Sequence, residues 1–252
     1  MKKAALFTSL FLIFSLAALA QNREERQVAP FTKINLSGPM DVVLEKGSAE
    51  AVRIETQNLD PQKVLTEVQN GTLKVYLEKG SEKGMKNIRT KVFVTYRNLH
   101  AIDRSGSGNL TVLSDLSAPQ FSFKSSGSRN LTCKGSIKAD QINFSASGSG
   151  NQEMAGFQTD LLNLSQSGSG NLKVSSGRAR TINLEASGSG NIDGFGLNSE
   201  VCRVKQSGSG NLTISTSETL EVSMHGSGNI LYKGSPNVRK LSSSGSGAVR
   251  KA

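Results

Sequence analysis

After about residue 105 the chain consists of short runs in which every second residue is apolar, and these runs recur regularly. In one unit Leu162 and Leu164 flank a polar residue, and Leu172 and Val174 do the same a few residues later. A spacing of two is typical of a β-strand with one buried face, and helical spacing is absent from these runs. The pattern therefore predicts two short strands in each unit.

A turn of the form SGSGN, complete or slightly altered, stands between the two strands of each unit. Its last residue recurs at intervals of 18 to 21 residues, at Asn109, Asn130, Asn151, Asn171, Asn191, Asn211 and Asn229, with Ala248 in the eighth place. A period of about 20 residues is that of a solenoid, because propeller blades need about 40. One unit cannot bury an apolar face alone, but coils stacked in register form continuous apolar columns. The sequence predicts an all-β fold, a parallel β-solenoid (β-helix), and a right-handed one because parallel crossovers nearly always are.

The turn residues have structural roles in this fold. Glycines such as Gly106, Gly108, Gly168 and Gly170 supply φ > 0 and allow turns to stack about 4.8 Å apart. The repeat asparagines are expected to form a ladder of hydrogen bonds between coils. Strand alternation leaves their direction open, inward or outward, because a turn resets it.

A second, outward ladder is expected on the strand before each turn. Its members are Asn143, Asn163 and Asn183, continued in alternating charge by Arg203, Glu221 and Lys240.

The region before the repeats predicts a cap. Residues 32–44 match an eroded first coil if Asp41 takes the asparagine place. The following residues, about 45–99, predict a hairpin with an Asn70-Gly71 turn, a helical turn capped by Asp60, and a strand at 91–96. Since a solenoid needs its open end covered, we expect this insertion to be the N-terminal cap.

The N-terminus has the pattern of a secretory signal peptide. Lys2 and Lys3 precede a mostly apolar run, and Ala18-Leu19-Ala20 offers a cleavage site. The predicted organisation is a signal peptide at 1–20, the first coil with its cap at 21–104, and the repeat solenoid at 105–252. No later run reaches the ~18 apolar residues of a membrane helix, so no transmembrane segment is expected in the mature chain. The predicted location is the periplasm, the cell surface or the extracellular space.

Charge and cysteine content refine this picture. The net charge of +10 would favour an acidic partner such as an anionic glycan, with an envelope protein as the other candidate, but a solvated basic surface is the simpler interpretation. The charges do not form the blocks of a nucleic-acid arm, so no nucleic acid is expected. Two cysteines in an exported chain invite a disulfide. However, Cys133 and Cys202 fall on inward positions three coils, or about 14 Å, apart, which predicts two buried free thiols.

A charged column eleven residues before each repeat asparagine is the best candidate for catalysis. Its members are Asp140, Asp160, Arg180, Glu200 and Glu218. Carboxylates at solenoid spacing can bind Ca²⁺ or flank a glycosidic bond. The simpler interpretation is a solvated polar loop in which Arg180 relieves acidic repulsion. The two histidines are isolated and the turns lack the helix of a nucleotide-binding loop, so no metal or cofactor is expected.

Several features together resemble one known family. They are the signal peptide, the FTKINLSG opening at 31–38, the NGTLKVYL hairpin and the run of SGSGN coils. Over about residues 28–249 the chain is similar to the putative auto-transporter adhesin, head GIN domain family. The resemblance implies an exported bacterial β-solenoid with a surface or adhesive role.

The sequence therefore favours a non-catalytic exported β-solenoid, an adhesin-like binding or structural protein of the cell envelope. If the protein is a structural protein of the envelope, its last coil is expected to dock another chain by strand addition. The alternative is a polysaccharide-processing β-helix enzyme, a lyase or hydrolase, that uses the column of Asp140, Asp160, Arg180 and Glu200. The chain has no Trp and nearly lacks outward aromatics, so any glycan contact is expected to be polar.

Overall fold

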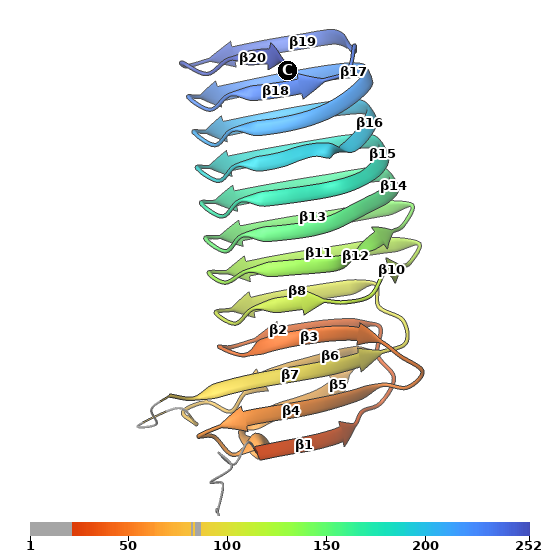
Figure 1. Cartoon of the computed structure of the whole chain (residues 1–252), viewed down its shortest axis with the longest axis vertical. Helices are drawn as coiled ribbons and strands as arrows, with labels where there is room; N and C mark the ends of the chain where they lie inside the picture. Colours follow the sequence, from red (N-terminus) through yellow and green to blue (C-terminus); the bar gives the residue numbers. More distant parts are fainter. Residues whose placement is uncertain (1–21, 82, 84–86) are drawn as a thin grey trace, which may run out of the picture.

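The computed structural model describes residues 22–252 except 82 and 84–86. The predicted signal peptide at 1–20 lies outside the described residues. The chain winds as a parallel β-solenoid of about eight turns, which confirms the predicted fold class. Figure 1 shows the coils stacked along the long axis of the molecule, with the N-terminal strands at one end and the C-terminus at the other.

Each coil has two walls joined at the SGSGN turn. We name the segment after each turn wall 1 and the segment before it wall 2. The early and the last coils use separate strands for the two walls, whereas each of β14 to β17 is one long strand that bends through both. The strands of the repeat region are β8 (Ala101–Gly106), β9 (Leu110–Val112), β10 (Leu116–Ser117), β11 (Gln120–Gly127), β12 (Leu131–Lys138), β13 (Gln141–Gly148), β14 (Gln152–Gly168), β15 (Leu172–Gly188), β16 (Ile192–Gly208), β17 (Leu212–Gly226), β18 (Ile230–Lys233), β19 (Asn237–Ser244) and β20 (Val249–Lys251).

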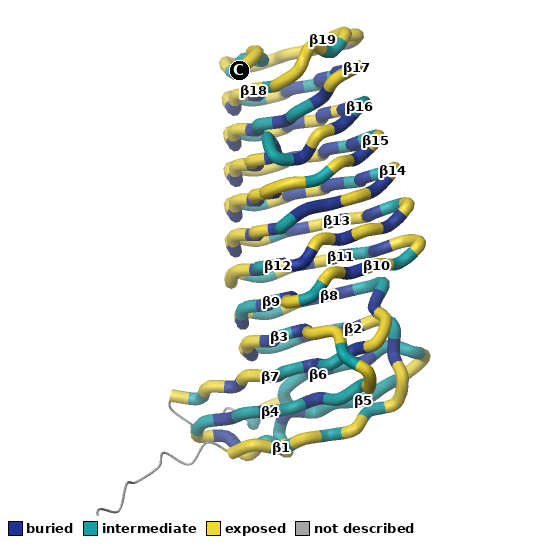
Figure 2. The backbone as a smooth tube through the Cα atoms, turned by 45° about the vertical axis from the view of Figure 1, so that its right-hand side comes forward, coloured by how far each residue is buried: buried dark blue, intermediate teal, exposed yellow. Residues whose placement is uncertain are grey.

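Neighbouring coils pair in register, so copies about 20 residues apart lie side by side. In wall 2, Leu162 lies between Ile142 and Ile182, and in wall 1 Leu172 lies beside Ile192. These inward side chains are buried between the walls, and buried and exposed residues alternate along the strands (Figure 2). Burying a side chain of this size contributes about 1.5–3 kcal/mol. The stacked apolar columns are therefore the main source of stability.

The two glycines of a complete SGSGN turn are needed for different geometric reasons. Gly168 has φ +107°, a conformation that L side chains rarely adopt, and Gly106 has φ +143°. Gly170 is needed for close approach, because a Cβ there would lie 2.1 Å from the carbonyl oxygen of Gly150 one coil earlier. Gly108 meets the backbone of Met40 in the same way. A larger residue at Gly170 would push its turn away from the preceding one, whereas the SGSRN turn accommodates Arg129 in the place of the second glycine.

The N-terminal strands close one end of the stack. The elements are β1 (Asn22–Gln27), β2 (Lys33–Ser37), β3 (Asp41–Lys46), β4 (Ala51–Gln57), the 3-10 turn η1 (Pro61–Lys63), β5 (Val64–Gln69), β6 (Thr72–Leu77) and β7 (Arg89–Tyr96). β2 and β3 form the first coil, and β6 and β7 lie parallel beside them as a further layer. β5, β4 and β1 then pair antiparallel, β5 with β6, β4 with β7 and β1 with β4, which ends the parallel stack.

The short elements predicted in this cap are present. Asn70 and Gly71 have φ of 50° and 68°, as the hairpin turn between β5 and β6 requires. The Asp60 side chain accepts a hydrogen bond from the Gln62 backbone N–H at 3.0 Å and so caps η1. Sequence-local signals therefore placed these turns correctly.

The prediction of two buried free thiols is confirmed. Cys133 is 2% exposed and Cys202 is fully buried, and neither forms a disulfide. Burial raises the pKa of each thiol from its usual value of 9.0 to about 12. The two cysteines act as small core residues and not as reactive groups.

Candidate functional site

The repeat asparagines form a column on the outside of the solenoid at the start of wall 1. The Oδ1 atom of Asn171 accepts hydrogen bonds from the backbone N of Asn191 at 2.9 Å and from its Nδ2 at 3.0 Å. Backbone N–H to Oδ1 bonds of this kind join each repeat asparagine to the next. The asparagines from 130 to 229 are exposed. The column therefore points to solvent, a direction that strand alternation could not fix.

Asp41 begins this column and Ala248 ends it. Asp41 Oδ1 accepts from the backbone N and the Nδ2 of Asn109, at 2.7 and 3.0 Å. The backbone N of Ala248 donates to Asn229 Oδ1 at 3.2 Å. Because each oxygen points to the following coil, the amide dipoles add, and the donors of the first amide point to a carboxylate. The arrangement is favourable for the same reason as an acidic residue at a helix N-terminus.

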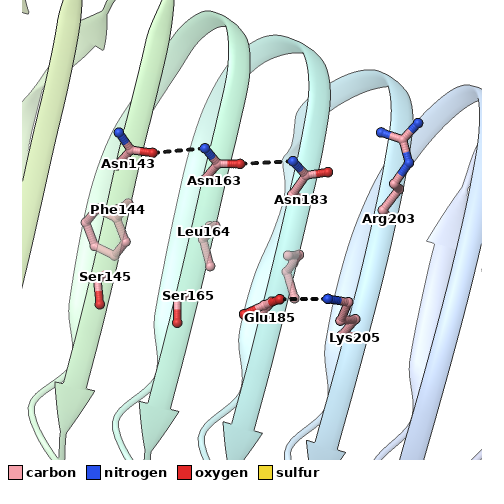
Figure 3. Close-up of a pocket in the computed structure, with 11 residues that line it drawn as sticks. Asn143, Phe144, Ser145, Asn163, Leu164, Ser165, Asn183, Glu185, Arg203 and Lys205 are labelled. Atoms are coloured by element: carbon pink, nitrogen blue, oxygen red, sulfur yellow. Dashed lines mark hydrogen bonds and ion pairs between the residues drawn. The ribbon is translucent and has the colours of Figure 1, made fainter.

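A groove of about 500 Å³ runs along the outer face of wall 2, across β13, β14, β15 and β16 (Figure 3). It is lined by Asn143, Asn163, Asn183 and Arg203, by Phe144, Leu164 and Leu184, and by Ser145, Ser165, Glu185 and Lys205. The lining residues take equivalent positions in successive coils. The groove therefore repeats similar polar groups at steps of about 4.8 Å.

The asparagine side of the groove is the second ladder that the sequence predicted. Asn163 Nδ2 donates to Asn143 Oδ1 at 2.9 Å, and Asn183 Nδ2 donates to Asn163 Oδ1 at 2.9 Å. Arg203 follows in the same column and forms an ion pair with Glu221 at 3.3 Å. The side chain of Lys240, predicted to continue the column, lies outside the described residues.

The other side of the groove carries hydroxyls and one ion pair. Glu185 and Lys205 lie 3.1 Å apart, with side chains 60% and 75% exposed. An ion pair this exposed contributes about 0–1 kcal/mol. A ligand that brings its own charged or hydrogen-bonding groups can therefore replace either partner at little cost.

The charged column proposed for catalysis lies at the corner between the two walls, beside a second groove of about 690 Å³. The structure brings Asp140, Asp160, Arg180 and Glu200 to this groove, and Glu218 is exposed outside its lining. Glu200 forms ion pairs with Arg178 at 2.7 Å and with Arg180 at 3.9 Å. Asp140 and Asp160 are exposed, whereas a glycosidase acid sits in apolar surroundings that keep it protonated. The column has the character of a solvated charged edge.

Polar side chains also fill the inside of several turns, which the sequence reasoning missed. Gln166 and Gln206 are buried, and each donates from Nε2 to the carbonyl of the second glycine in its own turn. Arg104 donates to the equivalent carbonyl from its guanidinium. These carbonyls need a donor because they lie away from water. Long polar residues five positions before the repeat asparagine were the available signal.

One outward aromatic was also missed. Phe195 stands four residues after Asn191, at a position that holds Ser175 and Ser215 in the neighbouring coils. Its ring lies 4.1 Å from Lys233 Nζ. The glycines on both sides of Phe195 were the signal, because isolated glycine within a strand indicates a bulge.

Residues 22–81, 83 and 87–252 contain neither a cluster of metal ligands nor a membrane-spanning helix. No group of three or more His, Cys, Asp or Glu side chains there could hold a metal ion. No helix in the same ranges has the length and apolar character needed to cross a membrane.

Stacked coils, outward amide ladders and grooved polar walls define a β-solenoid repeat protein. The chain belongs to the family described as putative auto-transporter adhesin, head GIN domain, whose model matches residues 30–132 and 122–236. This match confirms the resemblance noted in the sequence.

Solved structures from Parabacteroides share the fold. One, described as a putative adhesin from Parabacteroides merdae ATCC 43184, is 25% identical with a TM-score of 0.82, over 92% of this chain and 96% of that chain. Another, described as a putative lipid binding protein from Parabacteroides distasonis ATCC 8503, is 26% identical with a TM-score of 0.80, over 92% and 96%. A putative adhesin from the same strain is 24% identical with a TM-score of 0.82, over 92% and 97%, and shows the fold alone. The comparison with curated proteins returned no match.

Proposed function

We propose that this chain is an exported, non-catalytic binding protein of the adhesin type, and that wall 2 binds an extended saccharide along the solenoid axis. The observation that carries the proposal is the groove of Figure 3, which repeats amides over three coils and hydroxyls over two, with Arg203 and Lys205 in the fourth coil. A surface that repeats its own polar groups suits a polymer that repeats its polar groups too. Membership of an adhesin family supports the proposal.

The lining combines apolar surface with a row of hydrogen-bonding groups. Asn and Ser side chains both donate and accept, so they can match the hydroxyls of a sugar in several orientations. Phe144, Leu164 and Leu184 beneath them are 1%, 3% and 4% exposed. They offer little apolar surface to an acyl chain. The lipid-binding description therefore applies to the Parabacteroides distasonis protein and is not carried over to this chain. The experiment below includes lipid vesicles as the competing ligand.

The corner groove supports the non-catalytic part of the proposal. Its carboxylate with the strongest partners, Glu200, is neutralised by two arginines. Asp140 and Asp160 are exposed and Glu200 is held by ion pairs, so none of these three has the apolar surroundings of the acid that glycoside hydrolysis uses. A polysaccharide-processing enzyme has no comparable support.

The experiment is a glycan array probed with the purified protein, followed by titration of the best saccharide and of phosphatidylcholine vesicles. Ser165→Trp fills the middle of the groove and is expected to weaken saccharide binding at least about tenfold, the effect of losing a central contact. Thr132→Trp places the same bulk on wall 1 and is expected to leave binding unchanged. Equal effects of the two variants, or binding of the vesicles alone, would contradict the proposal.

A further inference from the structure

β16 departs from the regular wall at the segment Gly194-Phe195-Gly196. Its pairing with β17 is interrupted between Asp193 and Asn198, where four residues stand opposite a single residue of β17. The pairing with β15 lapses over the same segment. Figure 2 shows β16 bending out of the line of the stack. Bulges of this kind redirect a side chain and are common beside functional sites.

The bulge places an aromatic ring outside the core. The other phenylalanines of the repeat region are at most 1% exposed: Phe121, Phe123, Phe144 and Phe157. Phe195 is half-buried and belongs to neither the core nor the hydrophobic residues packed against it. Gly194 takes the inward position instead, where a Cβ would lie 2.8 Å from the Thr213 carbonyl oxygen. This coil therefore gives up a core side chain and presents a ring on wall 1.

A lysine lies over this ring. Lys233 Nζ is 4.1 Å from the ring centroid of Phe195, a cation–π contact that reaches across the intervening coil. Lys233 is exposed and forms no ion pair with a carboxylate of the described residues. Asp193, the carboxylate at the bulge, accepts a hydrogen bond from Thr213 Oγ1 at 3.0 Å. The ammonium group is therefore available to a ligand.

We propose that Phe195 and Lys233 form a second binding site, on wall 1, for an anionic saccharide. The part of the ring that Lys233 leaves open packs against the apolar face of one sugar, and the ammonium of Lys233 pairs with a carboxylate or sulfate on that sugar or its neighbour. Charge complementarity selects this ligand, since a cation that pairs with no carboxylate of the described residues, beside a half-buried aromatic ring, favours an anion with an apolar face. The net charge of +10 attracts such ligands over longer range.

The test compares oligogalacturonate with its methyl ester, which has the same sugars without the charge. Titration calorimetry on the whole protein is expected to show tighter binding of the charged form, weakened by salt. Phe195→Ala and Lys233→Gln should each lower the affinity for oligogalacturonate about tenfold. Lys233→Gln should leave binding of the ester unchanged. Lys134→Gln, which removes an exposed lysine from a distant coil of wall 1, is the matched control and should have no effect.

Phe195→Leu keeps an apolar side chain at the bulge and serves if the alanine variant does not fold. Equal affinity for the two probes, no binding of either, or no effect of Phe195→Leu and Lys233→Gln would overturn the proposal. The proposals for this site and for the groove can be refuted independently. Ser165→Trp blocks wall 2 and should leave oligogalacturonate binding at wall 1 intact.

Discussion

Asn171 shows how much one exposed side chain contributes to the stack. It accepts two hydrogen bonds from Asn191, and its own backbone N and Nδ2 donate to Asn151 at 3.0 and 3.1 Å. Asn171→Ala removes the acceptor and the Nδ2 donor at once. We expect it to lower the free energy of unfolding by about 1–2 kcal/mol, measured by urea denaturation.

Ser189→Ala is the matched control for this prediction. Ser189 is exposed in the next turn, and its loss is expected to change stability by less than about 0.5 kcal/mol. An asparagine variant no less stable than the serine variant would mean that the ladder adds nothing.

The thiols of Cys133 and Cys202 predict a dependence of stability on pH. Burial raises their folded-state pKa to about 12, from 9.0 for an exposed thiol. The unfolded chain therefore loses these protons first as the pH rises. The free energy of unfolding is expected to fall between about pH 9 and 12, and to fall less steeply in Cys202→Ala. Denaturation series across this pH range, with wild type and variant in parallel, measure both slopes, and identical slopes would refute the assignment.

The turn is the element that sets the coil spacing. The effect of close approach at its second glycine can be measured separately from the effect of a strained backbone conformation. In Gly170→Ala the Cβ would lie 2.1 Å from the Gly150 carbonyl oxygen, so adjacent turns must move apart. Gly80→Ala adds a Cβ with nothing within 4 Å, but at φ +81°. We expect a loss of about 2–3 kcal/mol or more at Gly170 and about 1 kcal/mol at Gly80. Thermal unfolding of both variants measures the difference, and a larger loss at Gly80 would contradict the stacking account.

The strands of the repeat could be predicted because their inward positions are apolar and two apart. Leu162 and Leu164 are buried as that spacing requires, and the intervening Asn163 lies in the outer ladder. The cap topology could not be predicted, because the parallel pairing of β6 with β2 joins segments far apart in the sequence. Local signals located the turn at Asn70 but carry no information on which strand lies beside it.

The candidate sites were less accessible from the sequence than the strands. The groove on wall 2 arises where short Ser145 and Ser165 side chains lie beside the asparagine ladder. The depth of such a groove depends on how far the side chains of neighbouring columns project from the wall, and the periodicity of the sequence carries no information on this. Phe195 escaped notice because its position follows no apolar pattern from coil to coil and holds Ser in both neighbouring coils, so only the flanking glycines marked the bulge.

At the scale of the whole molecule, every surface follows from the in-register stacking of coils. Each coil contacts mainly its neighbours, so the groove exists only where consecutive coils are folded together. A ligand that spans several coils is therefore expected to raise the unfolding temperature of the repeat region as a unit. Both walls carry the groups of the two proposed sites at intervals fixed by the strand spacing of about 4.8 Å.

Disulfide trapping between outward wall 2 positions tests this stacking most directly. Ser145 and Ser165 are register partners in adjacent coils, and Glu185 lies one coil further. Neighbouring strands, about 4.8 Å apart, allow a disulfide, whereas two coils exceed its limit of about 7 Å between Cα atoms. The double variant S145C/S165C is expected to form an intramolecular disulfide on mild oxidation, detected by mass spectrometry, while S145C/E185C keeps both thiols. Cross-linking of the second pair but not the first would contradict the parallel in-register solenoid.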